Sequence, residues 1–176
     1  MTAGTESKVI TDAARALIGK ELEPVTIEID KTLLKRFAIA VKSPNPPNPL
    51  YCDEEYAAKT AYGGIIAAPT LSGGFPWLGP ILEQVNPSMG KYRVGLNGGN
   101  EYQFFEPIRA GDVLTARPKL TNLSEKPRDD GGVMLVLDLE AEFRNQRGER
   151  VLAARQTLLR IYGPDQLQGF RPAGQT

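Results

Sequence analysis

The residues whose side chains are best suited to chemistry lie at the end of a proline-rich segment and just after it. Asn48, Tyr51 and Asp53 bring an amide, a phenol and a carboxylate close together in the sequence. A tyrosine side chain has a reference pKa of about 10, so near pH 7 it is a hydrogen-bond donor or a weak acid rather than a base. The chain has no histidine and a single cysteine, Cys52. It therefore has no imidazole for acid–base chemistry, no intrachain disulfide and no zinc site of the usual nitrogen and sulfur type.

Backbone groups further along could hold a developing negative charge. Gly63 and Gly64 let the backbone come close to a ligand, and they serve equally well to end a short helix. The amides around Ala67 and Ala68 open a helical segment, and a helix N-terminus favours an oxyanion. Pro69 removes one of those amides.

Three cations are candidates for contacts with phosphate groups. These are Lys91, Arg93 and Arg109. A lysine would bind a phosphate as a point charge and an arginine through two parallel hydrogen bonds, but all three could equally be solvated surface charges. The 21 basic and 21 acidic residues balance, so a dominant interaction with nucleic acid or with an anionic membrane surface is not expected.

The elements that must position these residues change character along the chain. Apolar spacing predicts helices over residues 11–18, 31–41 and 54–61, a short strand over 23–29, and a kinked or divided helix over 69–85. Asp30 and Asp53 are expected to cap the second and third of these helices. A period of two then predicts strands over residues 93–105, 112–124, 133–144 and 151–162.

The turns between these four strands are short. Residues 107–111, 127–132 and 145–148 each predict antiparallel neighbours. The chain is therefore expected to form one α+β domain, residues 1–162, in which an antiparallel sheet wraps around the apolar helical segment. Residues 163–176 are expected to form a C-terminal tail. A sheet with two open edges commonly pairs with a second copy or a relative.

The order of these segments resembles the order found in the MaoC-like, (R)-specific enoyl-CoA hydratases. Their motif runs Asp-x-Asn-Pro-x-His-x-Asp, and this chain matches it at Asn48, Pro49 and Asp53. A second match is Tyr62–Ala67, and a third is the Pro107–Asp112 turn. The chain is similar in particular to the FAS1-like dehydratase branch and to the N-terminal halves of two-part acyl-CoA hydratases. The resemblance implies the hot-dog fold.

The resemblance also shows what is missing. Tyr51 stands where the family has its catalytic histidine, and Pro46 stands where it has its catalytic aspartate. Hydration of an enoyl thioester needs an acid, a base and donors to the enolate oxygen. The interpretations of Tyr51 are a donor to the thioester carbonyl, a substitute acid, or an aromatic that closes a pocket. Asn48 more readily shapes the loop, and Asp53 more readily caps a helix.

Three functions follow from this pattern. The first is an acyl-CoA-binding subunit of an enoyl-CoA hydratase or dehydratase, a lyase, whose catalytic pair comes from a second hot-dog chain. In that case residues 71–77 would line an acyl tunnel wide enough for a bulky group. The second is a thioesterase that uses a carboxylate, and the third is a non-enzymatic acyl-CoA-binding module. The carboxylate candidates for the thioesterase are Asp53, Glu54, Glu55 and Glu101, the last of which lies on a predicted strand near the helix.

The resemblance implies no cofactor beyond the coenzyme A of the substrate, and no metal. A heterodimer or heterotetramer is expected, with a homodimer as the alternative. The N-terminal segment has no long apolar run, so a cytoplasmic protein is expected. The candidate substrate contacts are these: Asn48, Tyr51, Gly63, Gly64, Ala67, Ala68, Arg93 and Arg109.

Overall fold

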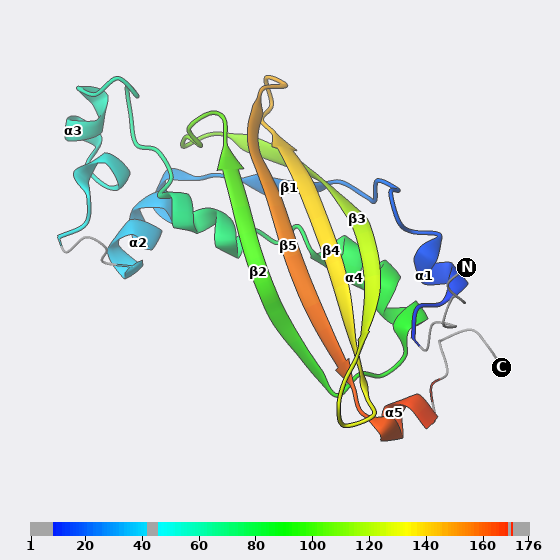
Figure 1. Cartoon of the computed structure of the whole chain (residues 1–176). Coiled ribbons are helices and arrows are strands. Elements are labelled where there is room, and N and C mark those ends of the chain that lie inside the picture. Colours follow the sequence, from blue (N-terminus) through cyan, green and yellow to red (C-terminus); the bar gives the residue numbers. More distant parts are fainter. Residues whose placement is uncertain (1–8, 42–45, 169, 171–176) are drawn as a thin grey trace.

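A computed structural model of the chain describes residues 9–41, 46–168 and 170 (Figure 1). Its centre is a curved antiparallel sheet with the strand order β1-β3-β4-β5-β2. The strands are β1 (Val25–Glu28), β2 (Val94–Phe104), β3 (Val113–Pro127), β4 (Val133–Arg144) and β5 (Arg150–Tyr162). The α+β class and the antiparallel sheet are as predicted.

The helical elements are short, and each begins or ends at a residue with a physical reason to be there. They are α1 (Asp12–Arg15), α2 (Lys31–Val41), η1 (Pro49–Tyr51), α3 (Glu54–Ala58), η2 (Pro69–Gly74), α4 (Gly79–Val85), η3 (Asn86–Met89) and α5 (Pro164–Gln168). The Asp30 carboxylate accepts the Leu33 amide at 2.8 Å, and the Asp53 carboxylate accepts the Glu55 and Tyr56 amides at 3.0 Å each. Both predicted caps are confirmed.

One predicted connection is wrong. The turn over 107–111 was expected to join antiparallel neighbours, but β2 pairs with β5, and β3 lies at the other side of the sheet between β1 and β4. The turn itself is tight, because Asp112 N donates to the Arg109 carbonyl at 3.1 Å and Gly111 has a φ of 88°. It is nevertheless a crossover and not a hairpin, because the free edge of β5 takes β2.

The core lies between the inner face of the sheet and the broken helical segment formed by η2 and α4. On β4, Val133, Leu135, Leu137, Leu139, Ala141 and Phe143 are all buried as predicted, and the alternation is interrupted only at Val136 of the other face, which is buried as well. The Phe143 ring has its centroid 5.9 Å from that of Phe75 and 6.5 Å from that of Trp77, the latter edge-on. The divided helix is confirmed, because the extended Phe75 backbone ends η2 five residues before the first proline of α4.

The far end of the sheet is closed by the C-terminal residues. Burial raises the pKa of Tyr162 to about 12, and its hydroxyl donates to the Met89 carbonyl at 2.9 Å. The Phe170 ring contacts the Tyr162 ring at a centroid distance of 6.1 Å. The predicted tail thus contains α5 and a core contact, whereas residues 169 and 171–176 lie outside the described part.

At the open edge, β2 carries an irregularity. Its register against β5 shifts between Asn97 and Gly99, which inserts Gly98 as an extra residue. A Cβ on Gly98 would lie 3.1 Å from the Thr157 carbonyl oxygen, so only glycine fits there without movement. Ten of the eleven β2 residues are exposed.

No helix among the described residues is long and apolar enough to cross a membrane.

We predict that Phe143→Ala lowers the free energy of unfolding of the chain by about 3–5 kcal/mol, because it removes a fully buried ring and its two aromatic contacts. Urea unfolding followed by circular dichroism measures this. The matched control is Phe104→Ala, whose ring is 42% exposed at the sheet edge. Equal losses for the two variants would contradict the assignment of the core.

Candidate functional site

A cavity of about 230 Å³ lies where β2 ends and the chain crosses toward β3. One wall is the end of β2 and the crossover, and the other is the segment that leads into η2. The lining residues are Tyr62, Ile66, Ala67, Pro69, Phe104, Phe105, Glu106, Pro107 and Ile108. The lining is therefore mostly apolar, with the exposed Glu106 as its one carboxylate.

The two walls are joined by backbone contacts. The Ala67 amide donates to the Ile108 carbonyl at 2.8 Å, and Ile66 forms an antiparallel bridge with Arg109. The Arg109 guanidinium donates to the Tyr62 carbonyl. Because Ala67 spends its N–H on Ile108, that amide is not free to stabilise an enolate oxygen.

A buried carboxylate holds the crossover in place. Asp112 is 2% exposed, and its carboxylate accepts the Arg109 amide at 2.8 Å and pairs with Arg147 at 3.4 Å. Gln146 adds two bonds, because it accepts the Val113 amide at 2.9 Å and donates to the Gly111 carbonyl at 3.1 Å. The β4–β5 turn therefore clamps the cavity wall.

The residues of the resembling motif lie on a helical arm beside the sheet, which we define as residues 31–41 and 46–62. In Figure 1 its helices α2 and α3 lie on the side of the sheet where β2 is the edge. The Asn48 side chain caps η1 by accepting the Leu50 amide at 3.0 Å. Tyr51 is partly exposed, and no hydrogen bond of its side chain occurs within the described residues. Neither lines the cavity.

The remaining predicted contacts divide between the cavity and other places. Gly63 adopts a φ of 67°, and no atom comes within 4 Å of a Cβ built on Gly63 or Gly64. Ala68 precedes η2 and is buried beside Ala67. Arg93 lies at the opposite end of β2 and pairs with Asp165 at 2.8 Å. The eleven residues of β2 span roughly 35 Å, so Arg93 and Arg109 lie beyond opposite ends of a long strand.

The carboxylates considered for hydrolysis are engaged elsewhere. Glu101 lies on the outer face of β2 and pairs with Arg155 at 3.2 Å. Glu54 accepts hydrogen bonds from Lys31 and Lys35, at 2.7 Å each, and these lower its pKa to about 2. Glu55 pairs with Lys59 at 3.5 Å. A base with so low a pKa as Glu54 is poorly matched to proton abstraction near pH 7.

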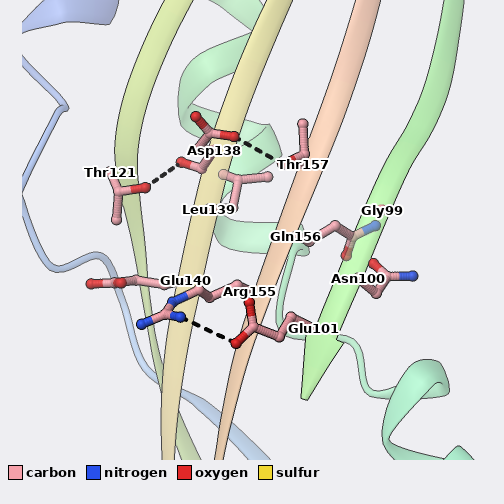
Figure 2. Close-up of a pocket in the computed structure, with 10 residues that line it drawn as sticks. All are labelled: Gly99, Asn100, Glu101, Thr121, Asp138, Leu139, Glu140, Arg155, Gln156 and Thr157. Carbon is pink, nitrogen blue, oxygen red and sulfur yellow. Dashed lines mark hydrogen bonds and ion pairs between the residues drawn. The ribbon is translucent and has the colours of Figure 1, made fainter. Parts of the chain in front are cut away.

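A larger hollow of about 360 Å³ lies on the outer face of the sheet (Figure 2). Some of its polar side chains pair with one another, whereas the side chains of Asn100 and Gln156, which also line it, have no hydrogen-bond partner within the described residues. Asp138 accepts from Thr157 at 2.9 Å, and Arg155 pairs with Glu101. Because several of these polar groups already satisfy one another, the smaller, apolar cavity is the better candidate for a ligand-binding site.

Sequence reasoning missed most of the cavity lining. Phe104 and Phe105 were assigned to a strand without a role, yet they form its rim and are 42% and 37% exposed. The available signal was two adjacent aromatic residues, which cannot both face the core of a strand. The Arg150 guanidinium covers the Phe105 ring at 4.0 Å from its centroid.

Comparison with known proteins identifies the chain's relatives. The family model described as FAS1-like, dehydratase domain region, matches residues 16–154. A UPF0336 protein of Thermobifida fusca is 28% identical over 156 residues, which cover 85% of this chain and 93% of that protein.

Solved structures show the fold. A MaoC-like dehydratase superposes with a TM-score of 0.68 at 22% identity, covering 89% of this chain and 47% of that one. The C-terminally truncated HadBC (3R-hydroxyacyl-ACP dehydratase) complex of Mycobacterium tuberculosis gives 0.61 at 23% identity, covering 81% and 96%. These neighbours confirm the predicted hot-dog fold.

We predict that Asp112→Ala lowers the free energy of unfolding by about 1–3 kcal/mol, because it leaves the Arg109 amide without its acceptor. The exposed Asp129→Ala should change it by no more than about 0.5 kcal/mol. Urea unfolding of the two variants compares them. An unchanged stability in Asp112→Ala would show that the crossover does not depend on this carboxylate.

The ion pairs of Glu54 with Lys31 and Lys35 predict that the free energy of unfolding depends on pH. A carboxyl whose pKa is lowered on folding stabilises the folded chain above its unfolded pKa, and this stabilisation is lost as the pH falls from about 4.5 to about 2. In the double variant Lys31→Ala/Lys35→Ala, the Glu54 pKa should return toward its ordinary value in an NMR titration. Lys59→Ala, which touches Glu55 instead, should leave it low. A Glu54 pKa near 4.5 in the unmodified chain would refute the pairing.

Proposed function

The chain belongs to the FAS1-like dehydratase family, and from this premise we propose that it is the acyl-thioester-binding subunit of an enoyl-thioester hydratase or dehydratase. In this proposal a second hot-dog chain supplies the acid–base pair. The reaction joins the oxygen of water to the β-carbon of the enoyl group and delivers a proton to the α-carbon. This chain contributes the acyl cavity and half of the interface.

The observation that carries the proposal is the absence of a carboxylate and of an imidazole at the two motif positions, Pro46 and Tyr51, while the architecture around them is kept. Pro46 has no titratable group, and the phenol of Tyr51 offers a hydrogen-bond donor in place of the imidazole of the family. Of the residues that line the cavity, Glu106 alone has a carboxyl group, and it is exposed. Neither the motif nor the cavity holds a matched acid and base.

The exposed apolar residues support a partner chain. Nine large apolar side chains are exposed among the described residues. Four of them lie on the helical arm, namely Ile39, Val41, Tyr56 and Tyr62, and four at β2, namely Val94, Leu96, Phe104 and Phe105. The ninth is Ile18. Exposed apolar surface concentrated at an open sheet edge is typical of an interface.

A partner that pairs with β2 would reach the cavity, because Phe104 both ends that strand and lines that cavity. The HadBC neighbour is described as a complex, and by analogy this chain pairs with a catalytic relative in a heterodimer or heterotetramer. The edge is equally open to a second copy, which makes a homodimer the alternative.

The thioester class of the substrate rests on the family and on the cavity. Arg109, whose guanidinium borders the cavity wall, is the better of the predicted phosphate contacts. Arg150, which covers the Phe105 ring at the rim, is a further cation beside it. Both could meet the phosphates of coenzyme A or of a carrier arm. We assign no cofactor apart from that carrier.

No observation favours the thioesterase alternative, because Asp53 caps α3 and the other carboxylates considered are paired away from the cavity. A binding module without catalysis would share the same cavity and edge. It is distinguished from the proposed subunit by whether hydration appears when a catalytic partner is added.

We predict that the purified chain alone does not hydrate enoyl-CoA substrates, and that it raises the activity of a co-produced hot-dog chain carrying the intact Asp-x-Asn-Pro-x-His motif. Loss of the enoyl absorbance measures hydration, and size-exclusion chromatography measures the complex. Leu96→Lys, at a 50% exposed edge position, should weaken complex formation and activity together at least tenfold.

The matched control is Ile18→Lys, which places the same charge at a 37% exposed apolar position away from β2 and the arm. It should leave both readouts unchanged. Robust hydration by the chain alone would overturn the proposal. So would full activity of the mixture in the absence of any complex.

A further inference from the structure

We infer that the inner face of the β2–β5 edge is a recognition site for a neutral oxygen-bearing group on the acyl chain, formed by Asn100, Tyr102 and Gln156. This inference rests on the proposed function and specifies its substrate class. The three side chains come from two adjacent strands. Nothing in the resembling motif or in the catalytic chemistry makes use of them.

The strand register places the three residues on the core side of the sheet. Asn100 pairs with Gln156, and Gln156 pairs with Leu139, which is 1% exposed in the core. Paired residues of antiparallel strands share a face, so Asn100 and Gln156 lie on the same face as Leu139. At the sheet edge Asn100 is exposed and Gln156 is half-buried, and both also border the hollow of Figure 2. By the same reasoning Tyr102 shares the inner face with the buried Ala154.

The helical segment leaves room opposite Tyr102. Its hydroxyl lies 3.9 Å from the point at which a Cβ on Gly73 would sit. Across the strands, Tyr102 is flanked by Ala154, and Ala154 by Ala141, both of which are small. The phenol therefore lies between a glycine of η2 and a row of alanines instead of among large side chains.

The three side chains are hydrogen-bonding groups that the protein itself does not use. Within residues 9–41, 46–168 and 170, none of them has a side-chain hydrogen-bond partner. Partial burial raises the pKa of Tyr102, which keeps its hydroxyl protonated and able to donate. Asn100 and Gln156 each offer both a donor and an acceptor.

The charge pattern selects a neutral ligand group. The charged neighbours on the same strands, Glu101 and Arg155, face outward and pair with each other at 3.2 Å. The inner positions 100, 102 and 156 carry amides and a phenol only. A hydroxyl, ketone or ring oxygen fits these groups, whereas a carboxylate would find no cation among them.

The site lies further along β2 from the proposed acyl cavity. Phe104 lines that cavity and lies two residues beyond Tyr102 on the same face, about 7 Å along the strand. Asn100 lies about the same distance further on. An acyl chain that leaves the cavity along β2 would pass Tyr102 first and then the Asn100–Gln156 pair.

The test compares two thioesters of equal chain size, 8-hydroxyoctanoyl-CoA and nonanoyl-CoA. Calorimetry is performed with the full chain purified from the cells that naturally produce it, together with any subunit that co-purifies. The unmodified protein should bind the hydroxylated ester about three- to tenfold more tightly, the effect of one or two hydrogen bonds. Tyr102→Phe and Gln156→Leu should each reduce this preference while leaving nonanoyl-CoA binding within about twofold.

Glu101→Gln is the matched control, because it changes the neighbouring residue on the outer face, and it should keep the full preference. Thermal melting of each variant verifies the fold. Equal binding of both esters by the unmodified protein, or a preference that survives in both inner-face variants, would overturn this inference and leave the proposed function standing. Failure of both esters to bind would instead count against the proposed function itself.

Discussion

The backbone pairing between β2 and β5 is the constraint on which the rest of the molecule depends. Ten register pairs join these strands, and they place β2 at the edge although it precedes β3 in the sequence. The chain must then cross from the end of β2 to the far side of β4. That crossover supplies Ile108, against which Ala67 is hydrogen-bonded, and so the cavity exists because of the pairing.

The crossover also links the cavity to the polar cluster of Asp112, Gln146 and Arg147, which does not line the cavity but holds its wall in place. Asp112 is buried at the end of the crossover, and Arg147 and Gln146 reach it from the β4–β5 turn. The pKa of Arg147 is raised chiefly by its hydrogen bond to Glu149, so the cation that faces Asp112 stays charged. The cavity wall is thus fixed by contacts between the crossover and the β4–β5 turn, two segments that are distant in the sequence.

Local features could be predicted from the sequence and long-range ones could not. The Asp30 and Asp53 caps depend on a carboxylate two or three residues from the amides that it accepts, so the sequence alone identifies them. The alternation on β4 is equally local. The partner of β2 depends on which strand edge is free in the assembled sheet, which neither periodicity nor turn length encodes. The predicted hairpin failed for this reason, and the exposure of Phe104 was missed with it.

The same distinction applies to the candidate site. Motif matching pointed to Asn48 and Tyr51, but their side chains lie on the helical arm and outside the cavity lining. Ala67 was predicted and does line the cavity, with its amide already bonded. Arg93 and Arg109 were grouped by charge, and the length of β2 separates them.

The glycine bulge in β2 has a consequence for what the open edge accepts. An extended chain that added to this edge would meet a change of register at Gly98, and could continue its ladder only with a matching irregularity of its own. A generic β-strand, such as an aggregating peptide or an unfolded neighbour, has no such feature. The bulge therefore makes regular addition of a further strand at this exposed edge less favourable, as bulges on the edge strands of natural sheets do.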